Sequence, residues 1–488
     1  MKKIPLVVMG FWRQLIQRPF YFFGAISLVF GSIFILLVPP FQSPDEFTHF
    51  TRTYEVSEFK IARDHFEKNK HTRGSLLPKS IGQTYDAVYL QQRARLPDVP
   101  QAKKYSLGQA KKALAIPLDK NVLKYYNTGS DPTYVPILYV PQALTVKILS
   151  LINSPILVML YATRIIGLLI WVLLALVALK IMRPTNRRFA LASVLLLPMF
   201  VAQASASTDP LLNGLTVLFL AIMTNVLISK KQLTLKLIVV LSATLTLMIM
   251  AKPAYIVFGL LVLAAKVNTS VVKGLVVKLL CLGIPFILYG FWTLLTRNTA
   301  GPLYVDAIAA SNAIPHEQAS YLFANIFNFF EPFINTLLLG WGDGVYASMI
   351  GNFGRLDTPL PTLFVTIGYI FTAVAIFVGP EESTEAKMSQ QFCHRKTAAW
   401  LTLIVAVVYT VGVYLAMYVY STPPREQVIT GVQGRYLLPL LPLLVLFVSK
   451  ALLTMRAKAY TLLMITAPLV LLIVSTIAIY LRFYIVYP

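Results

Sequence analysis

The sequence predicts an all-α, polytopic membrane protein with about eleven transmembrane helices and one large loop between the first two. Three observations predict this fold class. Hydrophobic residues make up 57% of the 488-residue chain and charged residues only 13%, whereas a soluble domain carries about 25% charged residues. Apolar runs of about 20 residues, the length that spans a bilayer, recur between Pro19 and Tyr480. These runs are apolar on all sides and do not alternate, which indicates helices.

The net charge of +23 is explained by basic residues in short loops, which fix the orientation of the spans and contact anionic membrane lipids. No basic module interleaved with aromatic residues is present, so nucleic acid is not an expected partner. The two cysteines, Cys281 and Cys393, have no metal-binding spacing and predict no disulfide.

The first span is expected over 20–38. Basic residues precede it, which predicts a cytoplasmic N-terminus. The run ends in Val-Pro-Pro rather than in a small-residue cleavage site, so we read it as a retained span and not a signal peptide. Residues 41–133 are too polar to enter lipid, and their length predicts a small folded cap.

Residues 134–151 are ambiguous, because two prolines and Lys147 interrupt an otherwise apolar run. The next run, 155–182, is a strong span that ends in an arginine cluster. That cluster is cytoplasmic only if 134–151 does not cross the membrane. We therefore expect 134–151 to lie at the membrane interface.

The remaining runs alternate across the membrane within one domain, 1–488, with a C-terminus outside the cytoplasm. The expected spans are 189–205, 211–228, 233–250, 254–265, 275–295, 361–379, 398–418, 435–449 and a last span that ends near Tyr480. A second outer segment is expected over 296–360.

A first group of polar residues follows span one. Prolines end the span, and Pro44 suits the first turn of a new helix. On that helix Asp45, His49 and Arg52 share one face by their i, i+4 and i+7 spacing. A carboxylate there can act as a general base or bind a metal. Equally, Asp45 and Glu46 are the acids expected in any first helical turn.

Two further groups lie near the same outer face. Asp209 stands between two spans, where it either caps the next helix or brings a second carboxylate to the surface that carries Asp45. Arg164 lies roughly 13 Å inside a span, where a charge usually faces a cavity or a partner. Lys252, beside Pro253 at the end of a span, reaches the interface more easily.

The segment 431–439 places Arg435 between glycine and tyrosine at the mouth of a span. Glycines allow close backbone approach, and a guanidinium binds phosphate in a bidentate manner. Gln433 and Tyr436 are its neighbours; the alternative is an interfacial Arg/Tyr anchor. Asp343, in a glycine-rich outer segment, is a further candidate for substrate binding.

Three stretches carry a resemblance to a known family: PPFQSPDEFTHFTRTYEVSE after span one, SASTDPLLNGL, and GVQGRYLLPLLP near the end. They resemble the DUF2142 family of bacterial membrane proteins, which is similar to the GT-C glycosyltransferases. The resemblance implies a GT-C-like fold in the plasma membrane, with a large first extracytoplasmic loop containing juxtamembrane helices. It implies a sugar donor linked to polyprenyl phosphate.

The resemblance also implies roles for individual residues. An acid after span one serves as base or metal ligand, which matches Asp45 or Glu46. A second acid in the next outer loop matches Asp209, and a phosphate-binding arginine matches Arg435. The substrate-binding set expected beside these is His49, Arg52, Arg164, Lys252, Asp343, Gln433 and Tyr436.

The expected function is transfer of a sugar from the polyprenyl-phosphate donor to a cell-surface glycan or a lipid-linked acceptor. Two alternatives remain open, a transporter or flippase for a lipid-linked glycan and a non-catalytic protein of envelope assembly. No cofactor is specified by the sequence, and a divalent metal stays an open alternative because no tight ligand spacing appears.

Overall fold

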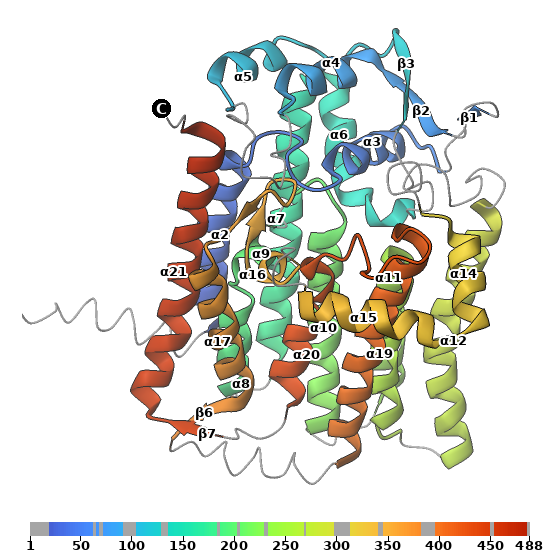
Figure 1. Ribbon diagram of the computed structural model, residues 1–488, viewed down its shortest axis with the longest axis vertical. Coiled ribbons are helices and arrows are strands. Elements are labelled where there is room, and N and C mark those ends of the chain that lie inside the picture. Colours follow the sequence, from blue (N-terminus) through green and yellow to red (C-terminus); the bar gives the residue numbers. More distant parts are fainter. Residues whose placement is uncertain are drawn as a thin grey trace, which may run out of the picture.

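The computed structural model describes residues 19–61, 65–67, 72–90, 104–127, 135–182, 186–202, 205–228, 233–267, 270–296, 313–339, 345–381, 396–448 and 453–485. Most of these residues are helical, and the long helices run side by side through the body of the molecule (Figure 1). The predicted all-α class is confirmed.

Six of the described helices are long and apolar enough to cross a membrane. They are α2 (Pro19–Leu37), α7 (Ile156–Ile181), α10 (Asp209–Ile228), α12 (Val271–Thr296), α19 (Lys396–Ser421) and α21 (Ala457–Tyr484). α10 is largely buried by its neighbours, whereas α12 is mostly exposed at the side of the bundle. The chain is therefore a multi-pass membrane protein with α10 near the centre of its helices.

The predicted count of about eleven spans is not confirmed. Several predicted spans form shorter helices: α11 (Leu235–Ala251), η2 (Pro253–Ala264), α17 (Thr362–Phe377), and η3 (Gly434–Leu437) with α20 (Leu440–Phe447). A seventh candidate was not predicted. It joins α14 (Pro315–Ala324) to α15 (Phe327–Leu339) through a bend of 110°, and α15 lies across the bundle in Figure 1.

The run 189–205 does not form one helix. It gives α8 (Asn186–Val194) and α9 (Pro198–Ala202), with a turn between them. Pro198 has no N–H to donate and disfavours helical geometry in the residue before it. Hydrophobicity alone did not predict this break, because the turn itself consists of three apolar, fully buried residues, Leu195, Leu196 and Leu197.

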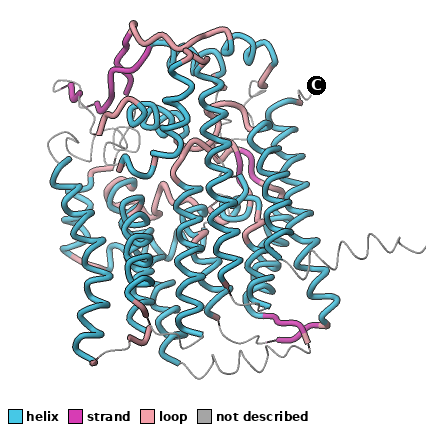
Figure 2. The backbone as a smooth tube through the Cα atoms, turned by 180° about the vertical axis from the view of Figure 1, so that it is seen from behind, coloured by secondary structure: helices cyan, strands magenta, loops and turns pink. Residues whose placement is uncertain are grey.

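The described parts of 41–133 form a folded cap at one end of the helices (Figures 1 and 2). Its helices are α3 (Glu46–Ser57), α4 (Lys79–Val88) and α5 (Leu107–Leu114), and its strands are β1 (His65–Glu67), β2 (Thr72–Pro78) and β3 (Leu123–Asn127). The strands form an antiparallel sheet in the order β1-β2-β3, with Leu76 opposite Tyr125. Phe50 and Ile81 of the cap share a core with Leu160 of α7, so the cap is packed onto the bundle.

The segment after the cap forms a 3₁₀ turn, η1 (Pro136–Leu138), and then α6 (Val140–Leu151). α6 packs against α3 and α7. A helix of 12 residues is about 18 Å long, well short of the hydrocarbon core of a bilayer. The place of 134–151 relative to the membrane stays a prediction.

Short elements complete both ends of the bundle. On the cap side, α16 (Ala347–Ile350) contacts η3, and β4 (Asn352–Phe353) pairs with β5 (Thr358–Pro359). At the end away from the cap, β6 (Val378–Pro380) pairs with β7 (Leu453–Met455), as Figure 1 shows.

Candidate functional site

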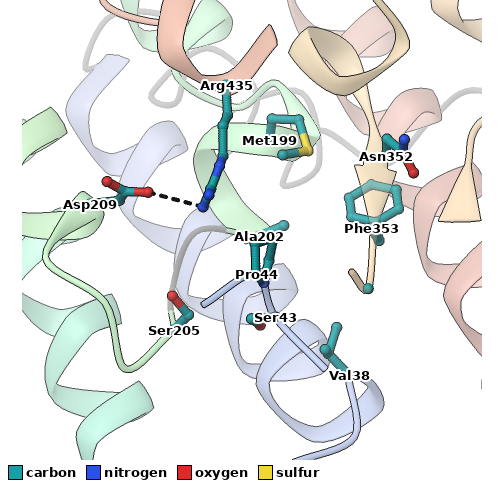
Figure 3. Close-up of a pocket in the computed structure, with 11 residues that line it drawn as sticks. Val38, Ser43, Pro44, Met199, Ala202, Ser205, Asp209, Asn352, Phe353 and Arg435 are labelled. Atoms are coloured by element: carbon teal, nitrogen blue, oxygen red, sulfur yellow. Dashed lines mark hydrogen bonds and ion pairs between the residues drawn. The ribbon is translucent and has the colours of Figure 1, made fainter. Parts of the chain in front are cut away.

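One guanidinium links two carboxylates beneath the cap. Nη2 of Arg435 lies 3.0 Å from Oδ2 of Asp45, and Nη1 lies 3.4 Å from Oδ2 of Asp209. Figure 3 shows Arg435 extending toward Asp209. The exposed fraction is 8% for the Arg435 side chain, 10% for Asp209 and 55% for Asp45. Asp45 is therefore the member of the three that faces solvent.

Asp209 has a second cationic partner. Nζ of Lys252 lies 2.9 Å from its Oδ1, and both Lys252 and Arg435 lie over the ring of Tyr436, at 5.1 Å and 5.4 Å from its centroid. We call Asp45, Asp209, Lys252 and Arg435 the charge cluster. Its formal charges cancel, and its two cations both lie over the Tyr436 ring, which favours both of them.

Local backbone geometry directs the Asp45 side chain toward Arg435. The residue precedes α3 in the left-handed conformation, with φ of 58°, which Asp adopts more readily than most side chains. Its carboxylate makes no capping hydrogen bond to α3. The carbonyl of Asp45 starts the helix instead, by accepting from the N–H of His49 at 3.0 Å. The carboxylate thereby remains available to Arg435.

A glycine makes the placement of Arg435 possible. A Cβ on Gly434 would collide with the backbone carbonyl of Val345, and the N–H of Gly434 donates to Oγ of Ser348 at 2.7 Å. Nε of Arg435 donates to Oε1 of Gln433 at 2.6 Å. Close packing of η3 against α16 therefore holds the start of the Arg435 side chain, and Gln433 orients its guanidinium.

A break between two helices positions Lys252. It follows α11 with an extended backbone, φ −148° and ψ 114°. Pro253 disfavours helical geometry at the residue before it, so α11 ends here and η2 begins. The lysine therefore stands at the junction of the two helices, from which its side chain reaches Asp209.

His49 lies beside the charge cluster in its neutral form. Its Nδ1 is 2.7 Å from the hydroxyl of Tyr139, in a buried hydrogen bond. Burial lowers the pKa of His49 from 6.5 to about 4, and the opposing attraction of Asp45 and Asp209 does not offset it. The imidazole is thus uncharged at neutral pH. It is a polar but neutral neighbour of the charge cluster.

Glu46 and Arg164 form a buried, bidentate ion pair. Oε1 and Oε2 of Glu46 accept from Nε and Nη2 of Arg164 at 2.7 and 2.6 Å. The remaining guanidinium protons go to the carbonyls of Ile35, Val38 and Pro39. All five donors of Arg164 are used, so this pair fastens the end of α2 to α7. The geometry favours a structural role for both residues over the predicted catalytic and substrate-binding ones.

Arg52 does not join Asp45 in the way that its spacing predicts. The guanidinium donates to Glu55 at 3.1 Å and to the carbonyl of Ile61 at 2.6 Å, and its side chain is fully buried. The prediction that Asp45, His49 and Arg52 share one helical face is wrong for Asp45. Asp45 precedes α3 in a left-handed conformation and is not part of the helix. Arg52 instead ties α3 to the turn that follows it.

A small cavity adjoins the charge cluster (Figure 3). Its volume is about 30 Å³, enough for one or two waters but not for a sugar. Asp209 and Arg435 line it together with Val38, Ser43, Pro44, Met199, Ala202, Ser205, Asn352, Phe353 and Gly354. Ser43 and Ser205 belong to the stretches that carry Asp45 and Asp209. No pattern in the sequence pointed to Asn352 or Phe353, which arrive from a distant turn.

The structure thus brings together six of the predicted site residues and holds His49 beside them. The six are Asp45, Asp209, Lys252, Gln433, Arg435 and Tyr436. Asp343 lies outside the described residues. Among the residues that the structure describes, no group of three or more His, Cys, Asp or Glu side chains could hold a metal ion. The roles of these residues in binding or catalysis stay predictions.

No curated protein and no solved structure matches this chain. A family model does, and its description reads "Predicted membrane protein (DUF2142)". The match covers residues 28–444, which takes in the charge cluster, the cap, the second half of α2 and the whole of α7, α10, α12 and α19. The chain belongs to the DUF2142 family of predicted membrane proteins.

Proposed function

We propose that this protein is a membrane glycosyltransferase that moves a sugar from a polyprenyl-phosphate donor to a cell-surface glycan or a lipid-linked acceptor. One observation carries the proposal: two carboxylates and two cations meet beneath the cap, at the end of the membrane helices. The proposal includes a GT-C-like fold of about eleven crossings. It also puts the N-terminus in the cytoplasm and the cap outside the bacterial plasma membrane.

The cations of the charge cluster suit the phosphate of the donor. Arg435 presents two Nη groups to oxygen acceptors, the arrangement that also matches two phosphate oxygens. Lys252 adds a second positive charge on the far side of Asp209. In the absence of donor, the carboxylates occupy these positions and keep buried charges paired. An arriving phosphate replaces Asp45 on Arg435.

This exchange frees Asp45 for the acceptor. The acceptor hydroxyl attacks the anomeric carbon of the sugar, the bond from that carbon to the phosphate oxygen breaks, and the configuration inverts. Asp45 takes the hydroxyl proton as general base. The bonding electrons leave with the phosphate, whose negative charge Arg435 and Lys252 stabilise. Asp209 holds both cations in place throughout.

The size of the cavity supports this order of events. A volume of about 30 Å³ beside Arg435 is far below the several hundred Å³ of a ligand pocket. Binding of the donor therefore requires that the contact between Asp45 and Arg435 opens. Asp45 is 55% exposed, so it can move into solvent at little cost, whereas Asp209 is held by two partners.

A transfer assay with purified protein tests the proposal. Lipid extract from a strain lacking the gene serves as the source of accumulated donor, and surface glycan from the same strain is the acceptor. We expect wild-type protein in detergent to increase the glycan mass by one sugar. A transporter needs two compartments and gives no mass increase in detergent, and that result would overturn the proposal.

A matched pair of variants tests the role of Asp45 in the same assay. Asp45→Asn should abolish the mass increase, while Asp86→Asn, an exposed cap aspartate in α4, should leave it unchanged. A non-catalytic protein of envelope assembly predicts equal results for both variants.

A further inference from the structure

A second, larger cavity lies on the side of the bundle. Its volume is about 630 Å³, and the walls come from α2, α5, α7 and α21. The residues that line it are Leu36, Tyr105, Leu107, Ala110, Leu114, Leu157, Val158, Tyr161, Ala162, Ile165 and Tyr484. Apart from the three tyrosines, every one of these side chains is apolar. We call this space the lateral cavity.

The lateral cavity is continuous with the lipid-facing surface. Three of its walls belong to α2, α7 and α21, which are long and apolar enough to cross a membrane. At its rim, Leu36 is 66% exposed and Ile165 is 48% exposed. Apolar side chains at such positions contact hydrocarbon in a membrane, so the cavity opens toward lipid.

The fourth wall, α5, is a short cap helix fastened to the end of α21. Nζ of Lys104 donates to the carbonyl of Arg482 at 2.9 Å, and the N–H of Tyr105 donates to the carbonyl of Phe483 at 2.8 Å. A capping box between Ser106 and Gln109 starts the helix. These contacts hold α5 over the cavity, so the space is built into the fold.

One feature of the lateral cavity suits an anionic amphiphile. On α5, Lys111 lies on the same helical face as Leu107 and Leu114, which line the cavity. Lys111 is exposed and adds a positive charge at the mouth.

We propose that the lateral cavity binds one hydrocarbon chain of an anionic membrane phospholipid. The chain fills the apolar space between α5, α7 and α21. The phosphate lies against Lys111. The ligand is a bilayer lipid, not the sugar donor, and the site shares no residue with the charge cluster. It stands or falls independently of the proposed transferase activity.

Photolabelling of the full-length protein tests this site. The protein is placed in phosphatidylcholine nanodiscs that contain phosphatidylglycerol with a diazirine on one acyl chain, and labelled peptides are identified by mass spectrometry after illumination. We expect labels on α5 and on the segment 157–165 of α7. Ala162→Trp fills the cavity and should reduce that labelling about tenfold, since an overfilled site excludes the chain. Ala110→Phe fills it from the α5 side and repeats the test should the first variant not fold.

The matched control is Leu169→Trp, which adds the same side chain one turn beyond Ile165 on the exposed face of α7 but outside the cavity. It should leave the labelling unchanged. Equal labelling in the filling and control variants would overturn the site. The headgroup is tested with the diazirine on phosphatidylcholine. Wild-type protein should prefer phosphatidylglycerol and Lys111→Gln should lose the preference, whereas equal labelling by both lipids in wild type would overturn the anionic part of the proposal.

Discussion

Arg435 and Asp45 are 390 residues apart in the chain, yet Nη2 of the arginine lies 3.0 Å from the carboxylate. The contact joins the start of the first cap helix to the 3₁₀ turn before α20. Asp209 contacts the same guanidinium from a third region. The three stretches that carry the family resemblance therefore meet at one point, beneath the cap.

Arg435→Lys is expected to lower sugar transfer about tenfold or more, because an ammonium cannot contact two acceptors in the planar, bidentate manner of a guanidinium. The rate is measured with purified protein and donor extract. Arg425→Lys is the control, since Arg425 is an exposed arginine in the loop before η3. Full transfer by the Arg435→Lys variant would show that the phosphate is not bound in this way.

Glu46→Gln is expected to destabilise the fold by about 3–5 kcal/mol, because it leaves the buried charge of Arg164 without its partner. Thermal unfolding in detergent measures the loss. Glu58→Gln, which removes a partly exposed partner of Lys120 and Lys147, should cost only about 1 kcal/mol or less. If Glu46→Gln keeps its stability and loses only transfer activity, Glu46 is catalytic and the structural role is wrong.

Gly434→Ala is expected to displace Arg435, because its methyl group would overlap the carbonyl of Val345 and a rigid backbone cannot yield. Both stability and transfer should fall. Gly412→Ala provides the comparison, since nothing lies within 4 Å of the position of its Cβ. That helical alanine should be neutral or stabilise by about 0.5–1 kcal/mol. Similar effects at the two positions would contradict this view of η3.

Stability should fall between pH 6.5 and pH 4 through His49. Its folded-state pKa of about 4 is below the usual 6.5, so the unfolded chain takes up a proton first as the pH falls. The contribution is constant above pH 6.5, and about 3 kcal/mol is lost by pH 4. Unfolding of wild type and His49→Gln, followed over this range, measures it. His316→Gln, an exposed histidine in α14, serves as control, and an unchanged pH profile in His49→Gln would contradict the assignment.

The sequence predicted the fold class and six members of the site because both rest on local signals. The length of an apolar run predicts a membrane helix. An acid or an arginine next to a proline or a glycine indicates the end of a helix, where the chain turns. Asp45, Asp209 and Arg435 all stand at such ends. The prediction that these three residues lie close together required one further assumption, that they face the same side of the membrane.

The remaining features depend on contacts between distant segments. The interior position of Arg164 predicted a partner, but only the packing of α2 on α7 shows that Glu46 and three carbonyls use all of its donors. Asp45 lies outside the helical face predicted for it, because its backbone is left-handed. The surrounding sequence does not require that conformation. The position of Asn352 at the cavity likewise comes from tertiary packing. The break before Pro198 is a local effect of the proline, which hydropathy does not register.

The most direct test of the central claim is the mass of the surface glycan in a deletion strain that carries Asp45→Asn. If the charge cluster is a transferase site, the glycan of this strain should lack one sugar, as it does in the deletion strain. Wild-type protein should restore the sugar. The two proteins should be present in the membrane at equal levels. A glycan of wild-type mass in the Asp45→Asn strain would contradict the claim.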